Sequence, residues 1–165
     1  MSPAAKRPAR GALEEFLVRQ TELLDRRNWD EWIDLFADDG IYWMPLKEDQ
    51  TDPENYPSIF YEDKALMAAR VGRLRDPNAW GQQPRTRTIH LIGNVRLDGA
   101  SSRNGEIVVR SNFSVAEFRR DVLRHHDGTY THHLRRVRNG FKIAMQRVDL
   151  INADGIHEYN LQVFF

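Results

Sequence analysis

The stretch that decides the fold is residues 86–98, which read TRTIHLIGNVRLD. Apolar and polar side chains alternate along it, with Ile89, Leu91, Val95 and Leu97 on one side and Thr88, His90, Asn94 and Arg96 on the other. A period of two residues is typical of a β-strand that turns one face toward a core. The same period returns in residues 107–115 and 141–150, so the second half of the chain is predicted to be a meander of long antiparallel strands.

Three dipeptides mark the predicted turns of this meander. They are Asp98-Gly99, Asp127-Gly128 and Asn139-Gly140, and such pairs tolerate the positive φ angles that tight hairpin turns require. With a turn at residues 127–128, the histidine pairs at 125–126 and 132–133 would lie on opposite arms of one hairpin.

The first half of the chain has the helical period instead. Apolar residues between about 11 and 27 fall near one stripe, which predicts an amphipathic helix. A second, short helix is expected after Asn28, stopping at Asp38-Asp39-Gly40. Asp63 is placed to cap a third helix that runs to about residue 73.

Short strands and polar loops separate these helices. The aromatic run at residues 41–44, closed by Pro45, predicts a short strand, and residues 59–61 predict another. Residues 47–56 are polar and read as a long loop. Helices that precede antiparallel strands indicate an α+β fold. A strongly curved antiparallel sheet wrapped on the N-terminal helices would bury one sheet face and give a cone that could enclose a pocket.

Composition narrows the classes of function. The 165 residues fit one domain, expected at 11–165 behind a flexible arm at 1–10. The 24 basic and 24 acidic side chains cancel, which gives no support to nucleic-acid binding. The chain has no cysteine, so it cannot bind an iron–sulfur cluster through thiolates, and we expect a cytoplasmic protein. No apolar run approaches the roughly 20 residues of a membrane span.

The histidine pairs admit two readings. In the predicted hairpin His125 and His132 would be diagonal neighbours at roughly 7–8 Å, while His126 and His133 would lie roughly 13 Å apart. One metal ion needs ligands about 2 Å from a shared centre. Polar histidines on a solvated or subunit-facing sheet surface are therefore favoured over a metal site.

His90 also admits two readings. On the polar face of its strand it could line the cone and act as a general base with Asp38 or Asp39. A hydrogen-bonded structural histidine is the favoured reading.

Several short motifs follow one another from about Leu13 to Phe165. They are Leu13-x-x-Phe16-Leu17, Leu23-Leu24-Asp25-x-x-x-Trp29-Asp30-x-Trp32, Ala37-Asp38-Asp39, Tyr42-Trp43-Met44-Pro45, Arg70-Val71-x-Arg73-Leu74, Thr86-Arg87-Thr88-x-His90-x-x-x-Asn94-Val95, Arg110-Ser111-Asn112-Phe113 and Asn160-Leu161-x-Val163-Phe164-Phe165. In this order and spacing they resemble the β, or small, subunits of Rieske-type non-haem iron aromatic-ring-hydroxylating dioxygenases.

The resemblance implies a cone-like fold, similar to nuclear transport factor 2 and scytalone dehydratase, and an α3β3 assembly with a trimeric base of β subunits. It places the Rieske 2Fe-2S cluster and the mononuclear Fe(II) on a catalytic α subunit. Electrons would come from NADH through a reductase, sometimes with a ferredoxin, and O2 would be added across an aromatic ring. Residues 86–90 resemble the benzoate branch, whereas the terminal Phe164-Phe165 resembles the biphenyl and naphthalene branches. An aromatic carboxylic acid is the favoured substrate.

On this view the chain carries no catalytic, cofactor-binding or metal-binding residue. The residues expected to act in structure or in subunit contacts are Trp43, Pro45, Arg87, His90, Asn94, Phe164 and Phe165. The apolar segment 163–165 is expected to be buried, in the core or against a neighbour. The alternative is a stand-alone isomerase or dehydratase, in which His90 and an aspartate work inside the cone.

Overall fold

The computed structural model describes residues 8–98, 105–157 and 160–165. The helices are α1 (Arg10–Asp25), α2 (Trp29–Asp34), α3 (Lys64–Arg75) and the 3-10 helix η1 (Trp80–Gln82). The strands are β1 (Phe36–Pro45), β2 (Ser58–Glu62), β3 (Arg87–Asp98), β4 (Ile107–Arg119), β5 (Val122–Val137) and β6 (Gly140–Leu150). None of the helices in these three ranges has the length and apolar character to cross a membrane.

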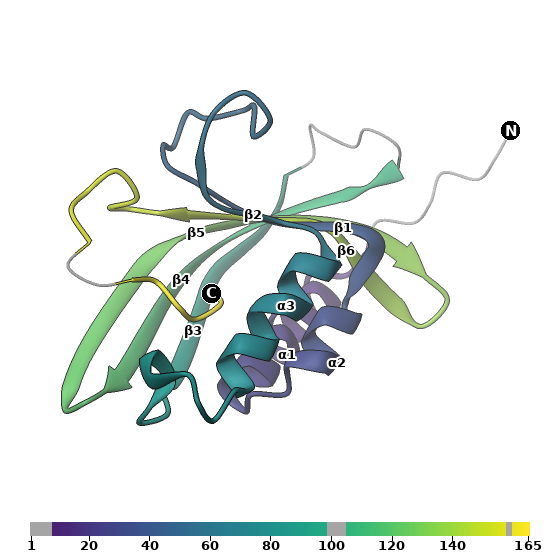
Figure 1. The fold of residues 1–165 in the computed structure, drawn as a ribbon. Helices are drawn as coiled ribbons and strands as arrows, with labels where there is room; N and C mark the ends of the chain where they lie inside the picture. Colours follow the sequence, from purple (N-terminus) through teal and green to yellow (C-terminus); the bar gives the residue numbers. More distant parts are fainter. Residues whose placement is uncertain (1–7, 99–104, 158–159) are drawn as a thin grey trace, which may run out of the picture.

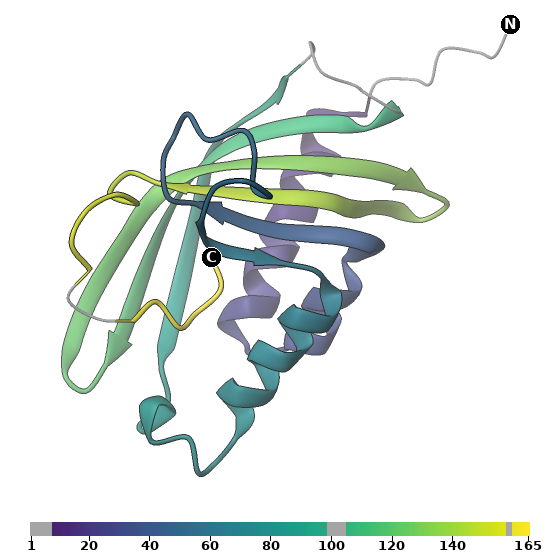
Figure 2. The same ribbon diagram turned by 45° about the horizontal axis from the view of Figure 1, so that its top comes forward.

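The strands form one curled sheet in the order β2-β1-β6-β5-β4-β3. Helices α1, α2 and α3 lie on its concave side, as Figure 1 and Figure 2 show, and the predicted α+β cone is confirmed. The pairs are antiparallel except β1 with β6, which run parallel. The sheet is therefore not purely antiparallel, because the chain passes through a long crossover between these two strands.

The predicted turn at Asp127-Gly128 is wrong. Both residues lie in the middle of β5 and pair with β4 and β6. Gly128 serves close approach instead, because a Cβ atom there would lie 2.1 Å from the carbonyl oxygen of Asp149. The β4–β5 turn is made by Arg120 and Asp121, whose φ angles are 50° and 59°.

The two other predicted turns have different outcomes. The β5–β6 turn lies at the predicted place: Arg138 and Asn139 make it, and Gly140, the first residue of β6, has a φ of 129°. At Asp98-Gly99 the strand β3 ends on Asp98, while Gly99 falls outside the described residues.

The predicted helix stop at Asp38-Asp39-Gly40 is also wrong. Helix α2 ends at Asp34, and β1 begins at Phe36, so the tripeptide belongs to a strand of 10 residues. The register of β1 against β6 shifts between Phe36 and Ile41, which leaves the two aspartates exposed. Pairing with a strand distant in the sequence prevails here over a local turn signal.

The predicted faces of β3 are inverted in its first half. Ile89 and Leu91 are 59% and 67% exposed, whereas His90 is 8% exposed. Asn94 has a φ of 55°, and the register against β4 shifts at this point. The irregularity reverses the alternation, because one extra residue moves the following side chains to the other face. Val95 is therefore buried on the same face as His90.

Residues 160–165 cross the open side of the cone and end within it (Figure 1). Phe164 is 2% exposed and lies with its ring centroid 4.4 Å from that of Trp32. Phe165 is fully buried, with ring centroids 6.3 Å from Phe113 and 4.7 Å from His126. The predicted burial of the apolar end is confirmed, and it takes place in the chain's own core.

Candidate functional site

A chain of hydrogen bonds crosses the interior of the cone. His132 Nε2 donates to Gln20 Oε1 at 2.9 Å, and Gln20 Nε2 donates to Gln146 Oε1 at 2.5 Å. Gln146 Nε2 donates to the Phe165 carbonyl oxygen at 2.8 Å, and the Phe165 N–H donates to the Tyr42 hydroxyl at 3.2 Å. Each of these five residues is at most 1% exposed, so the network ties α1, β1, β5 and β6 to the terminal segment.

His132 is a fixed neutral donor in this network. The amide oxygen of Gln20 can only accept, so the imidazole carries its proton on Nε2. Burial, helped by the nearby His133, lowers the pKa of His132 to about 3. The ring is therefore uncharged at neutral pH.

His90 is buried and forms a second pair, with the partly buried Asp25 at the end of α1. Its Nδ1 lies 2.6 Å from Asp25 Oδ1, and its backbone N–H donates to Oδ2 at 3.0 Å. The Thr88 hydroxyl donates to Oδ1 at 2.8 Å. Burial works to raise the pKa of Asp25, but the hydrogen bonds and charge of His90 outweigh it and hold that pKa below its usual value.

The predicted partners of His90 were therefore misplaced. Asp38 and Asp39 are exposed on β1, and Asp39 is bound by Arg135 at 2.5 Å. An aspartate on Nδ1 is the arrangement that orients a general base. However, the His90 side chain is fully buried, and its Nε2 has no hydrogen-bond partner among the described residues. It could exchange a proton only with a group inside the packed cone.

Two further buried pairs of a basic and an acidic side chain lie beside the terminal segment. His126 Nε2 lies 2.8 Å from Glu117 Oε2, beside the ring of Phe165. Arg70 donates to Glu62 at 2.8 Å. The Arg70 guanidinium lies 3.5 Å from the ring centroid of Phe164, so charged and aromatic groups clamp both terminal phenylalanines.

The paired histidines do not converge on a metal. They follow one another along β5 and bind separate partners, with His133 Nδ1 lying 3.3 Å from Glu106 Oε2. In the ranges that the structure describes, no three His, Asp or Glu side chains are arranged to hold a metal ion. Without cysteine, the residues also do not fit a Rieske cluster, which takes two Cys and two His ligands.

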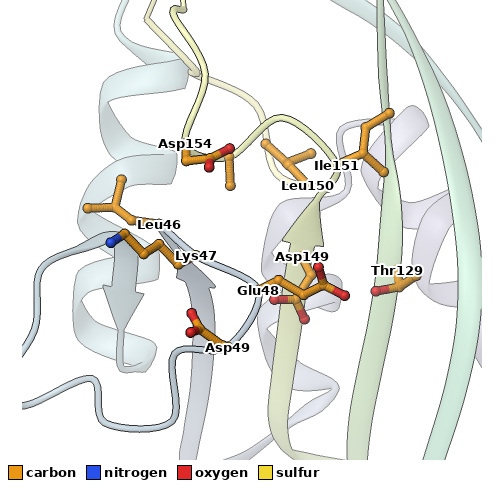
Figure 3. A pocket seen from close by; sticks show the side chains of 10 residues that line it. Leu46, Lys47, Glu48, Asp49, Thr129, Asp149, Leu150, Ile151 and Asp154 are labelled. Atoms are coloured by element: carbon orange, nitrogen blue, oxygen red, sulfur yellow. The ribbon is translucent and has the colours of Figure 1, made fainter.

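A cavity of about 880 Å³ opens on the outer side of the sheet, between residues 46–49 and 149–154. Figure 3 shows that Glu48, Asp49, Asp149 and Asp154 lie around it. Asp149 is bound by Arg147 through two hydrogen bonds of 2.8 and 2.9 Å. The polar loop at 47–56, predicted from the sequence, thus forms one wall of an acidic cleft, which we call the loop cleft.

The other residues expected in subunit contacts are spread over the fold. Trp43 is 4% exposed, and its Nε1 donates to Ser58 Oγ at 2.9 Å. Pro45 is buried at the end of β1. Arg87 and Asn94 are exposed on β3. The structure unites His90, Phe164 and Phe165 in the interior, and the roles of all seven residues in assembly remain predictions.

Several interior residues escaped the sequence reading. Gln20 carried a signal, because it stands on the apolar stripe of α1, three residues after Leu17. Asp25 and Arg70 stand in the motifs quoted above, but no local signal marked their roles. The partners of Asp25 and Gln146 lie far away in the sequence, and Glu62, eight residues before Arg70, lies on a different element.

Comparison with known proteins agrees with this architecture. Residues 19–154 match the family model of the ring hydroxylating beta subunit. The 2-halobenzoate 1,2-dioxygenase small subunit of Burkholderia cepacia is 34% identical over 87% of this chain and 88% of its own length. The solved beta subunit of benzoate 1,2-dioxygenase from Burkholderia mallei is 27% identical, with a TM-score of 0.74 over 94% of this chain and 99% of its own. A naphthalene 1,2-dioxygenase structure shares the fold, at 20% identity and a TM-score of 0.79 over 98% and 89% of the two chains. The chain belongs to the family of ring-hydroxylating dioxygenase beta subunits.

Proposed function

We propose that the chain is the non-catalytic base of an α3β3 terminal oxygenase and is inactive alone. The observation that carries this is the filled cone, in which Phe164, Phe165 and the hydrogen-bonded chain from His132 to Tyr42 take up the interior. A rigid, closed interior suits a platform. The Rieske cluster and the mononuclear iron would be held by the catalytic α subunit, which would supply the oxygen chemistry.

The proposed substrate of the complex is a benzoate-like aromatic acid. Support comes from the relatives, since the 2-halobenzoate and benzoate enzymes act on such acids by name. Electrons would reach the complex from NADH through a reductase, with or without a ferredoxin.

The proposal also covers the setting of the chain. Residues 11–165 would act as one domain in the cytoplasm, without nucleic acid or membrane as partner. The arm proposed for residues 1–10 falls mostly outside the described residues.

The Asp25–His90 pair is the one feature that favours a stand-alone isomerase or dehydratase. Its geometry suits a general base, but a substrate would first have to displace residues 160–165. The pair is better explained as a tie between α1 and the sheet, because Asp25 also accepts hydrogen bonds from the His90 backbone N–H and the Thr88 hydroxyl on β3.

Co-purification with a candidate catalytic subunit tests the proposal. The pair should elute as one red-brown complex that consumes O2 with NADH, reductase and an aromatic acid, and the chain alone should be colourless and inactive. Turnover of a substrate by the isolated chain, or failure to bind any catalytic subunit encoded beside it, would refute the platform role.

His90→Ala separates the two functions further. In a platform the variant should lose stability, while the assembled complex keeps its turnover per iron. In a stand-alone enzyme the same change should abolish turnover at unchanged assembly.

A further inference from the structure

Four apolar side chains occupy neighbouring positions on the outer face of the sheet, on β3, β4 and β5. We call Ile89, Leu91, Phe118 and Leu123 the sheet patch. Ile89, Leu91 and Leu123 are 59%, 67% and 58% exposed. Phe118 pairs with Leu123 on the next strand. Exposed apolar side chains gathered on one face in this way are a common feature of interaction sites.

The rim of the sheet patch is mainly basic. Arg85, Arg87 and Arg120 are exposed around it, and the Arg87 guanidinium lies 4.8 Å from the Phe118 ring centroid. Asp121 and Asp127 offset part of this charge. The patch therefore fits a partner that offers apolar contact inside an acidic surround.

The loop cleft of this chain offers that chemistry. Glu48, Asp49 and Asp154 are exposed on its walls, and Ile151 is 77% exposed beside them. Lys47 is the only lysine or arginine in residues 46–57. Figure 3 shows the acidic and aliphatic side chains side by side around the opening.

The two surfaces are neighbours on the outer face. Glu48 lines a hollow of about 420 Å³ together with Asn112 and Thr129. Asn112 and Thr129 pair with each other. The next rung on the same face is the pair Ser114 and Asp127, and it continues to Leu91 on β3. The hollow, which Arg96 and Arg110 also line, therefore reaches the rung next to the one that carries Leu91.

We infer that the sheet patch of one copy docks on the loop cleft of a second copy. The inference rests on the proposed trimer and identifies its contact surfaces. If two sheet patches met face to face, their arginines would repel one another. A sheet patch that meets a loop cleft brings basic and acidic side chains together instead, and the net charge of the chain is zero. Two different, adjacent surfaces on each copy give a head-to-tail contact that can close into a ring.

Matched aspartate substitutions test the inference. Leu91→Asp breaks the sheet patch, Ile151→Asp breaks the loop cleft, and Leu66→Asp alters a similarly exposed leucine on α3 as the control. Masses are measured by light scattering on the full chain, and urea unfolding checks that each variant is folded.

The wild type and Leu66→Asp should have the mass of three copies, and each of the other variants should fall threefold to one copy. Mixed, the two broken variants should form a one-to-one pair, because one intact patch meets one intact cleft. A self-complementary contact could not be rescued by mixing. A wild-type monomer would sink the trimer itself. If Leu91→Asp still forms a trimer, or if the mixture stays monomeric, only the assigned surfaces are wrong. If a variant keeps the trimer but no longer binds the catalytic subunit, the sheet patch is a contact surface for that subunit instead.

Discussion

At the scale of single residues, Asp25 holds α1 to the sheet through three hydrogen bonds with His90 and Thr88. Asp25→Asn removes the charge that strengthens them, and we expect a loss of about 1.5–3 kcal/mol in the free energy of unfolding. Because the pKa of Asp25 is lowered on folding, its contribution is full above its unfolded pKa of 3.8 and is lost as pH falls through the lower folded value. Urea unfolding at pH 7 checks the loss, with exposed Asp38→Asn as the control. Equal midpoints for the two variants would contradict the prediction.

His132 sets a second pH dependence, at higher pH. Its pKa falls from 6.5 to about 3 on folding, so between these values the unfolded chain binds the extra proton and stability declines as pH falls. Between pH 6.5 and 5 the loss from this group is about 1.6 kcal/mol. His132→Gln should flatten that part of the stability profile, and exposed His125→Gln should not. If stability depends on pH in the same way in the wild type and in His132→Gln, His132 is not a neutral buried histidine.

At the scale of elements, residues 160–165 act as a plug for the cone. Phe165→Ala leaves a cavity lined by aromatic rings, and we expect a cost of about 3–5 kcal/mol in stability. A small apolar ligand such as benzene or indole should raise the melting temperature of the variant more than that of the wild type. Val163→Ala, at a half-buried position, is the control. A variant as stable as the wild type would show that the plug is not part of the core.

The bulge in β3 depends on Asn94. A positive φ costs most side chains about 1–2 kcal/mol, and asparagine less. Asn94→Gly should therefore be tolerated, and Asn94→Val should lose about 1–2 kcal/mol. Thermal unfolding of both variants measures the difference in stability between them. If Asn94→Val is more stable than Asn94→Gly, the bulge does not depend on a positive φ at residue 94.

The elements also show how far the sequence could lead. The period of α1, the Asp63 cap on Leu66 N–H at 2.9 Å and the Asn139-Gly140 turn rest on local signals, and all three were predictable. Gly128 looked like a turn residue, but its role is contact with Asp149, which only the folded sheet reveals. The bulge at Asn94 was likewise invisible, so the first half of β3 was predicted with the wrong face inward, whereas Val95 in the second half was predicted correctly. In the interior, His90 could be named from the sequence, whereas its partner Asp25 depended on how α1 crosses the sheet.

At the scale of the whole molecule, the proposed contact between copies is electrostatic as well as apolar. Raising NaCl from about 0.05 M to about 0.5 M shortens the screening length from roughly 13 Å to roughly 4 Å. The trimer dissociation constant should rise by about tenfold or more, while the urea midpoint of the folded chain changes little. Sedimentation at both salt concentrations measures the dissociation constant of the trimer. A dissociation constant that does not change with salt would show that charge does not contribute to the contact.

The parallel pairing of β1 with β6 has a consequence for biosynthesis. β1 and β2 join the rest of the sheet only through β6. During synthesis, the aromatic residues 41–44 of β1 therefore cannot pair with β6 until residue 150 has left the ribosome. Non-local pairing of this kind makes folding slow and exposes apolar strand surface in the meantime. Yield in a heterologous host should therefore respond to growth temperature and chaperone supply more than the modest size of the chain would suggest.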